Sequence, residues 1–207
     1  MITTKIWAES LEVESGEFLS PVANCLKPYA RQAREVATRA IILQGVVAVA
    51  YQVAAGPVVN WFQAQGIWDE VTPQERAFLL STTRTKAVQL DYRRKQEAEW
   101  TLLWMIGKVE SLGLPTHFCD TKLLVNSIIP ALGDSVHDFI GQAELRVPGA
   151  LLAEDERTYN LWCYAFAAKR RKEELPNDLN LGVLRERRYA FEWMDGMQNW
   201  DEVTCDS

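Results

Sequence analysis

Three observations predict an all-α fold for this chain of 207 residues. Apolar residues recur at helical spacing through most of it, and no segment keeps the two-residue alternation of a half-buried strand. Helix-capping patterns, above all Thr72-Pro73-Gln74-Glu75, precede several of these segments. No Asn-Gly or Asp-Gly turn joins two strand-like runs. We therefore expect a single helical domain of about seven or eight helices.

The N-terminal half is expected to begin with a short extension. Residues 1–27 are acidic and poor in apolar side chains, so the domain is expected to span 28–207. The first helix is predicted over 29–55, ended by Gly56-Pro57, because proline disrupts a helix interior. A short helix over 58–65 follows and closes at Gly66, and Thr72 and Pro73 then start a helix over 73–81.

The C-terminal half is expected to contain longer helices. One is predicted over 84–111, with a basic, exposed first half and a buried second half, WTLLWMIGKV. The others are predicted over 121–129 (capped by Asp120), 135–146 (capped by Asp134 or Ser135), 148–174 (starting at Pro148) and 181–195 (capped by Asn180). The apolar stripe expected on the 148–174 helix consists of Leu152, Tyr159, Cys163 and Phe166, with Trp162 alongside.

Composition and charge exclude several classes of protein. With 48% hydrophobic and 24% charged residues, the chain resembles a soluble globular domain. Its net charge of −6 disfavours a nucleic-acid partner, because the phosphate backbone attracts basic surfaces. The uncharged stretch between Arg39 and Asp69 is interrupted by glutamines and by Gly56-Pro57, so a buried helix is expected there and no membrane span.

The location is predicted from the cysteines and from the first residues. Four widely spaced cysteines indicate free thiols in a reducing compartment, and the start lacks a signal-peptide pattern. We therefore expect a cytoplasmic protein.

The pentapeptide Trp-Asp-Glu-Val-Thr occurs twice, at 68–72 and at 200–204, each time seven residues after another tryptophan. Two explanations are open: a duplication, or two helix ends at which the chain folds back and a tryptophan fills the core. The chain has eight tryptophans, and we expect most of them to pack the helices together.

No motif of a known catalytic or metal site is present. His117-Phe118-Cys119-Asp120 is the one local cluster with suitable atoms, either for a nucleophile with its base or for half a metal site. The simpler interpretation is a loop in which Asp120 caps the next helix. His137 is expected to be exposed. We therefore predict no catalytic residue, no metal and no cofactor, and we do not expect an enzyme.

Three charged residues fall on faces that are predicted to be buried. Arg187 lies on the apolar stripe of the last helix, Arg146 on the buried side of the 135–146 helix, and Glu97 on the face of Trp100 and Trp104. A buried charge must be paired, so Glu97 is expected to meet one of the two arginines. Such a pair either fixes helix register or lines a pocket for an anionic or planar ligand.

Two basic runs are interpreted as exposed helix faces. Residues 169–172 are followed directly by two glutamates, and residues 93–95 by Glu97 and Glu99. Opposite charges on one helix face are typical of a solvated surface. Contact between these runs and a nucleic acid is the least favoured hypothesis.

An ordered set of residues resembles a known family. Leu103-Trp104, Leu145-Arg146, Tyr159 to Trp162, Glu186-Arg187-Arg188 and the closing Trp200-Asp201-Glu202-Val203 occur in its order, over about 39–207. The chain is similar to the bacterial domain-of-unknown-function family 4272. This resemblance does not indicate which reaction, if any, is catalysed. The resemblance singles out six residues as candidate ligand-binding positions: Glu97, Arg146, Trp162, Arg187, Trp200 and Asp201.

The function expected from the sequence is that of a non-catalytic binding or protein-interaction module. Its partner is expected to be a protein or a small anionic ligand, with no membrane contact. The alternative is a small-ligand-binding protein or an enzyme that uses the buried Arg/Glu cluster.

Overall fold

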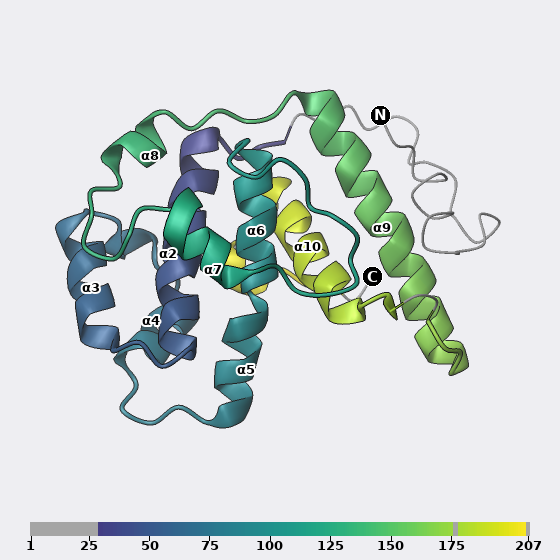
Figure 1. Ribbon diagram of the computed structural model, residues 1–207, viewed down its shortest axis with the longest axis horizontal. Coiled ribbons are helices and arrows are strands. Elements are labelled where there is room, and N and C mark those ends of the chain that lie inside the picture. Colours follow the sequence, from purple (N-terminus) through teal and green to yellow (C-terminus); the bar gives the residue numbers. More distant parts are fainter. Residues whose placement is uncertain (1–28, 176–177, 206–207) are drawn as a thin grey trace.

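Four helices stand side by side in the computed structural model, which describes residues 29–175 and 178–205 (Figure 1). Helix α2 (Ala33–Ala50) packs on α6 (Gln96–Met105), α6 packs on α10 (Leu181–Met194), and α10 packs on α9 (Pro148–Arg171). The described residues contain no strand, so the predicted helical fold class is confirmed. The extension expected over 1–27 lies outside the described residues.

Shorter elements surround the α2 and α6 end of this row. They are α3 (Ala55–Ala64), α4 (Pro73–Leu80), α5 (Lys86–Arg94), α7 (Thr121–Leu123) and α8 (His137–Gly141). Figure 1 shows α7 crossing in front of α2 and α6, with α3 and α8 on the outer side of α2. Two 3-10 turns, η2 (Trp68–Glu70) and η5 (Trp200–Glu202), and one π-helical turn, η3 (Leu124–Ile128), complete the described elements.

Helix α2 is the centre of the core. It is buried on nearly all sides, as the all-round apolar pattern of its sequence predicts, and it contacts α3, α4, α5, α6 and α8. No helix in the described part of the chain combines the length and the apolar character that a membrane crossing requires.

Three predicted caps are confirmed. The Thr72 hydroxyl accepts a hydrogen bond from the Glu75 amide at 3.3 Å, and the Glu75 carboxylate accepts one from the Thr72 amide at 3.0 Å, which completes a capping box. Asp120 accepts from the Lys122 amide at 2.9 Å. Asn180 accepts from the first amides of α10.

The first helix ends earlier than predicted. Its last residue is Ala50, and Gln52 adopts a left-handed φ of 75°. The amides of Gln52 and Val53 turn back onto Val49 and Ala48, which is the Schellman pattern of a helix end. Pro57, expected to stop this helix, instead lies in the first turn of α3, where no intrahelical partner for its missing N–H is needed.

The prediction of one long helix over 84–111 is wrong, because the chain forms two helices, α5 and α6, with a break at Lys95. The Lys95 amide bonds to the Tyr92 carbonyl in a tighter three-residue turn. The Lys95 ammonium lies 2.9 Å from a Glu186 carboxylate oxygen and 3.3 Å from the centroid of the Tyr189 ring. Contacts with α10 therefore stabilise a bend between α5 and α6 that the local sequence does not predict.

Two further predictions in the C-terminal half are wrong. The helix expected over 135–146 is only five residues long, α8, so Arg146 does not lie on a helix. The stripe expected on α9 is also displaced: Phe166 is exposed, and the buried face is Leu151, Glu154, Thr158, Leu161, Trp162, Ala165 and Ala168. Because this face carries polar residues, apolar periodicity alone does not find it.

The two copies of Trp-Asp-Glu-Val-Thr have the same local structure. Each begins with a 3-10 turn, η2 or η5, after a helix that contains the earlier tryptophan. Trp200 is buried, whereas Trp68 is only half-buried. The fold-back interpretation therefore describes both copies, and the second one fills the core more completely.

Candidate functional site

Glu97 and Arg187 form the buried ion pair that the sequence predicts. The Arg187 Nε lies 2.8 Å from Glu97 Oε1, and the two side chains are 2% and 0% exposed. The remaining guanidinium nitrogens donate to the Gly113 carbonyl at 2.8 Å and the Leu112 carbonyl at 2.7 Å. Every nitrogen of this guanidinium therefore has a protein acceptor.

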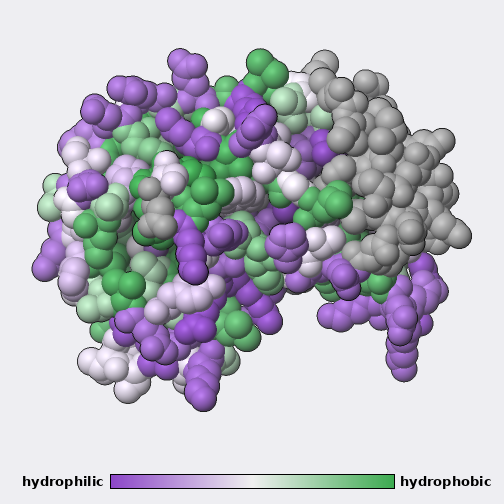
Figure 2. Space-filling model, in the orientation of Figure 1, coloured by the Kyte–Doolittle hydropathy of each residue, from purple (hydrophilic) through white to green (hydrophobic). Residues whose placement is uncertain are grey.

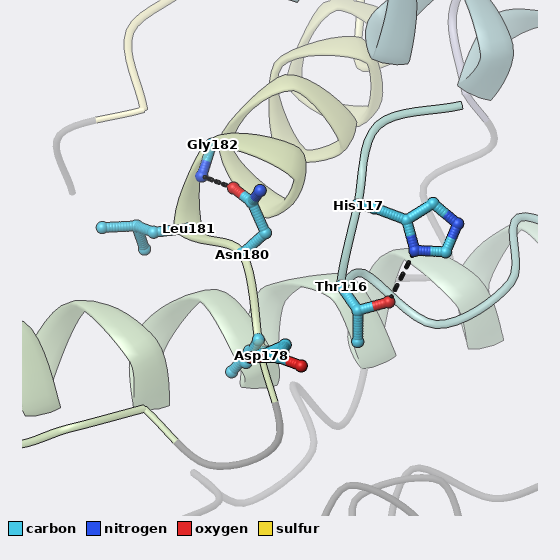
Figure 3. A pocket seen from close by; sticks show the side chains of 7 residues that line it. Thr116, His117, Asp178, Asn180, Leu181 and Gly182 are labelled. Carbon is cyan, nitrogen blue, oxygen red and sulfur yellow. Dashed lines mark hydrogen bonds between the residues drawn. The ribbon is translucent and has the colours of Figure 1, made fainter. Parts of the chain in front are cut away.

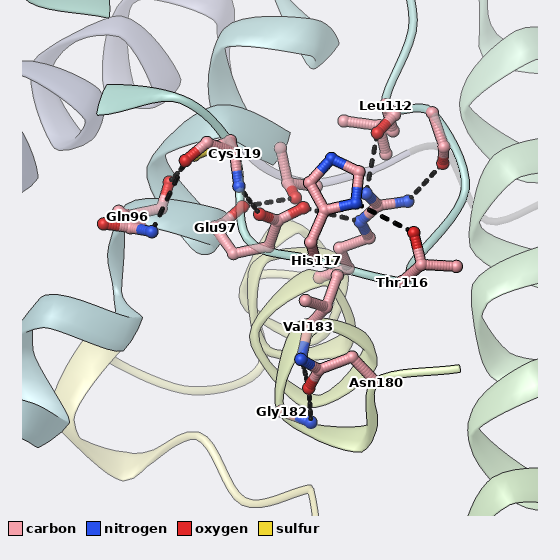
Figure 4. Close-up of polar contacts among 12 residues, drawn as sticks. Gln96, Glu97, Leu112, Thr116, His117, Cys119, Asn180, Gly182 and Val183 are labelled. Carbon is pink, nitrogen blue, oxygen red and sulfur yellow. Dashed lines mark hydrogen bonds and ion pairs between the residues drawn. The ribbon is translucent and has the colours of Figure 1, made fainter. Parts of the chain in front are cut away.

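The second Glu97 oxygen is occupied as well. It accepts a hydrogen bond from the Cys119 amide at 2.8 Å, and Figure 4 shows the Glu97 and Cys119 groups turned toward each other. The pair thereby joins α6, α10 and the loop over 112–119. These contacts give it a role in holding three segments in register.

Arg146 does not reach Glu97, contrary to one of the two pairings that the sequence left open. It lies in the irregular segment after α8, where it donates to the carbonyls of Trp104 and Val109, each at 2.6 Å. Its guanidinium carbon also lies 5.0 Å from the centroid of the Trp104 ring. Arg146 therefore binds the C-terminal end of α6, where helix carbonyls lack partners within the helix.

The other three predicted site residues lie elsewhere. Trp162 is buried on α9 and stacks on Phe166. Trp200 packs against α10, and Asp201 accepts a hydrogen bond from the Gln74 amide of α4 at 3.0 Å. The structure brings Glu97 and Arg187 together but does not gather the six residues at one place. Their role in ligand binding stays a prediction.

The cluster around His117 and Cys119 shows no activated nucleophile. Burial, Glu97 and Glu99 raise the pKa of the Cys119 thiol, which keeps its sulfur protonated. The exposed His117 ring instead contacts the Thr116 hydroxyl at 2.9 Å. His137 is exposed, as predicted. Among residues 29–175 and 178–205, no group of three or more His, Cys, Asp or Glu residues could hold a metal ion.

A hollow of about 630 Å³ lies beside this cluster, at the start of α10 (Figure 3). His117 and Asp178 on its wall are exposed. The Asn180 oxygen is already used to cap α10, as Figure 3 shows. None of the described residues that line this hollow has a buried polar atom without a partner, so the hollow offers no evidence of a ligand site.

A second cavity, of about 260 Å³, is chemically different. Its walls come from α2, α3, α6, α7, η3 and residues 130–132, and they are mostly apolar. The rings of Tyr51 and Trp61 line it, and so does the carboxyl group of Glu99. We call this cavity the Glu99 pocket.

The carboxyl group of Glu99 has no partner among the residues that the structure describes. The side chain is fully buried, and neither oxygen has a hydrogen bond within the described residues. Burial is the sole cause that raises the pKa of Glu99 well above the usual 4.5, and no charged neighbour contributes. Leaving a buried polar group unpaired costs on the order of 1–3 kcal/mol, so an orphan carboxyl in a pocket needs an explanation.

Every other buried carboxylate among the described residues is paired. The pairs are Glu75 with Arg39 at 2.7 Å, Glu97 with Arg187 at 2.8 Å, Glu154 with Arg157 at 2.7 Å and Glu186 with Lys95 at 2.9 Å. Glu99 departs from a rule that the rest of this fold follows. This contrast makes the Glu99 pocket the candidate functional site.

The prediction that Glu99 lies on a solvated helix face is wrong, because its side chain is fully buried. An α-helix turns about 100° per residue, so Glu97 and Glu99 point in nearly opposite directions from α6. The Glu97 side faces α10, and the Glu99 side lines the pocket against α2. Because Glu99 precedes the buried Leu102 and Leu103 by three and four residues, the argument applied to Glu97 could have found it.

The rim of the Glu99 pocket is apolar and exposed. Tyr51, Val53, Val125 and Leu132 all line it, and they are 43–47% exposed. Figure 2 shows hydrophobic side chains gathered on this face over α2, α3 and α7, among hydrophilic ones toward the periphery. The π-helical turn η3 forms part of the wall, and such turns are frequent at functional sites.

The comparisons with known proteins identify the family but not the activity. A search of curated proteins and a search of solved structures each found no match. The sequence model of one family, described as "Domain of unknown function (DUF4272)", matches residues 5–203. This match begins well before residue 39, where the resemblance in the sequence was expected to start, and it covers nearly the whole chain. The chain therefore belongs to the DUF4272 family.

Proposed function

We propose that this chain is a non-catalytic binding protein whose ligand site is the Glu99 pocket. One observation carries the proposal: a fully buried carboxyl without a partner lines an apolar cavity. Ligand sites commonly combine apolar walls with a few polar groups that orient the ligand. A bound molecule would supply the partner that Glu99 lacks.

The size of the pocket suits a small molecule or one end of a larger one. Its volume of about 260 Å³ exceeds the roughly 150 Å³ of an apolar cavity that holds benzene. The exposed rim supports entry from solvent, because apolar patches on a surface mark binding sites. A partner protein that inserts an apolar side chain would use the same opening.

A fluorescent probe tests the site. N-phenyl-1-naphthylamine is neutral at pH 7 and apolar, and its emission rises when it leaves water. We expect saturable binding by the full chain, and an affinity lowered about tenfold in Ala48→Leu, since the added carbons occupy the pocket.

The control is Ala153→Leu, which makes the same change at a half-buried position of α9, away from the pocket. This variant is expected to bind the probe like the unmodified chain. Equal binding by all three proteins, or no binding at all, would overturn the assignment of the Glu99 pocket as a ligand site.

The proposal includes a cytoplasmic location in a bacterium. The resemblance to a bacterial family supports the source. Three cysteines, Cys119, Cys163 and Cys205, carry free thiols, which is typical of proteins in a reducing compartment.

A further inference from the structure

We infer that the Glu99 pocket binds an apolar molecule that carries one protonated amine, with the amine held by the Glu99 carboxylate. This inference rests on the proposed function and adds the chemical class of the ligand. Three features of the lining support it: the single unpaired carboxyl, the absence of any Lys or Arg, and two aromatic rings.

The first feature gives the ligand its charge. A carboxylate in an apolar site is stabilised by a cation at hydrogen-bond distance, and no lining residue is a cation. The other buried glutamates show how this fold treats such groups, because Arg or Lys neutralises each of them. At Glu99 the ligand would take the place of that side chain.

The second feature concerns the remaining polar atoms. The Tyr51 hydroxyl already donates to Gln96 at 2.7 Å, and the Trp61 indole N–H already donates to the Asp134 carbonyl at 2.8 Å. The Arg93 guanidinium lies over the Tyr51 ring and Phe62 stacks on Trp61, so each ring offers its remaining surface to the pocket. Aromatic faces attract cations. A protonated amine therefore finds a carboxyl group and aromatic rings in one pocket. An anion would find no cationic side chain among the lining residues.

Neighbouring groups show how charge is arranged around the pocket. Arg93 donates to the Ala50 carbonyl and lies 4.9 Å from the centroid of the Tyr51 ring. The Cys119 thiol and the Tyr51 hydroxyl are further ionisable groups near Glu99, and the raised pKa of Cys119 keeps its thiol neutral. Glu97 is engaged with Arg187 on the opposite side of α6.

Binding of the amine is coupled to a proton. In the empty pocket burial raises the pKa of the Glu99 carboxyl and so favours its neutral, protonated form. When an ammonium group enters, the acid releases this proton to solvent, and an ammonium–carboxylate pair remains. One proton leaves for each ligand bound, so the affinity for the amine rises by about tenfold per pH unit while Glu99 is protonated in the free protein.

The test compares 2-phenylethylamine with its neutral isostere 2-phenylethanol and with the anion 3-phenylpropanoate. Isothermal titration calorimetry of the full chain at pH 7, in two buffers of different ionisation enthalpy, measures affinity and proton release together. We expect the amine to bind about tenfold more tightly than the alcohol, with a net release of protons that falls as pH rises, and the anion to bind more weakly than both.

A matched pair of variants separates charge from shape. Glu99→Gln is expected to lose the preference for the amine and the proton release, and to bind the alcohol within about threefold of the unmodified chain. Glu144→Gln removes an exposed carboxylate away from the pocket and is expected to change neither. Because the amine and the alcohol are compared on the unmodified chain, the test does not depend on the folding of a variant.

The outcomes distinguish the two proposals. Equal affinity for amine and alcohol, without proton release, overturns the amine inference and leaves the pocket as a ligand site. Binding of neither compound, together with no binding of N-phenyl-1-naphthylamine, overturns the proposed function itself.

Discussion

Glu99 and Glu97 show at the residue scale how position alone changes the chemistry of a side chain. They are two residues apart on α6 and equally buried, yet Glu97 is held by Arg187 and the Cys119 amide, and Glu99 by nothing within the described residues. The paired glutamate holds three segments together. The unpaired one leaves a cost in the folded state that a ligand can remove.

This cost depends on pH. In the unfolded chain Glu99 loses its proton near pH 4.5, whereas burial keeps it protonated to a higher pH in the folded chain. The stabilising contribution of Glu99 to the free energy of unfolding is therefore fully present below about pH 4.5. It is lost as the pH rises toward the pKa of Glu99 in the folded chain.

Replacing Glu99 tests this dependence. We expect Glu99→Gln and the unmodified chain to differ least in free energy of unfolding near pH 4.5. Above it, the unmodified chain should fall behind by up to about 1.4 kcal/mol per pH unit, until the folded pKa is reached. Urea unfolding followed by circular dichroism at several pH values measures the difference. A difference that stays constant with pH would mean that the Glu99 carboxyl finds a partner.

At the scale of elements, the close approach of α2 and α3 forms one side of the Glu99 pocket. The approach depends on Gly45, because a Cβ atom there would lie 2.3 Å from Cζ of Phe62 and 2.7 Å from Cγ1 of Val58. Both side chains are fully buried and cannot move aside. The glycine is required by packing, since its φ is not in the left-handed region.

Adding one methyl group at this contact should be costly. We expect Gly45→Ala to lower the free energy of unfolding by about 1–3 kcal/mol, because α2 and α3 must separate. Gly149→Ala, in the first turn of α9 where a Cβ meets nothing within 4 Å, should leave it unchanged or raise it by about 0.5 kcal/mol. Thermal unfolding measures both, and equal midpoints would contradict the packing argument.

Sequence predicted those parts of the elements that local interactions decide. The caps at Thr72, Asp120 and Asn180 each need only their own segment, and all three are found. The end of α2 and the break before α6 were missed because distant groups favour them: Arg93 donates to the Ala50 carbonyl, and Lys95 reaches Glu186. A pattern along the chain does not contain these contacts.

The candidate site was predicted less well, for a related reason. Spacing identified the buried face of Glu97 and a partner for it, because α10 carries an arginine on an equally apolar stripe. Residue spacing could not show that Glu99 is unpaired, because that depends on the side chains of every element packed around it. The pocket needs α2, α3, α6, α7 and residues 130–132 together.

At the scale of the whole molecule, η5 joins the C-terminal region to the first half of the fold. Trp200 packs edge-on against Tyr189 and Trp193, and the Arg39 guanidinium carbon lies 5.1 Å from the centroid of its ring. Asp201 next to it binds the α4 amide of Gln74. In the other copy of the pentapeptide, the partly exposed Arg76 lies over the ring of Trp68, which packs against the edge of the core.

The two tryptophans should therefore differ in energetic weight. We expect Trp200→Ala to lower the free energy of unfolding by about 3–5 kcal/mol, because a large buried side chain is lost. Trp68→Ala should cost less than about half as much, since this ring is only half-buried. Urea unfolding followed by circular dichroism compares the two variants. Equal losses in free energy of unfolding would contradict this and show that the two tryptophans stabilise the fold equally.

The seating of Trp200 also sets an order for folding during synthesis. Arg39 and Gln74 emerge from the ribosome long before residue 200, so their contacts with η5 must wait. Until residue 200 is synthesised, the contacts of its ring with α2 and α10 cannot form. Completion of the core therefore requires synthesis of η5, and a pause in translation before this point is expected to leave these contacts unformed.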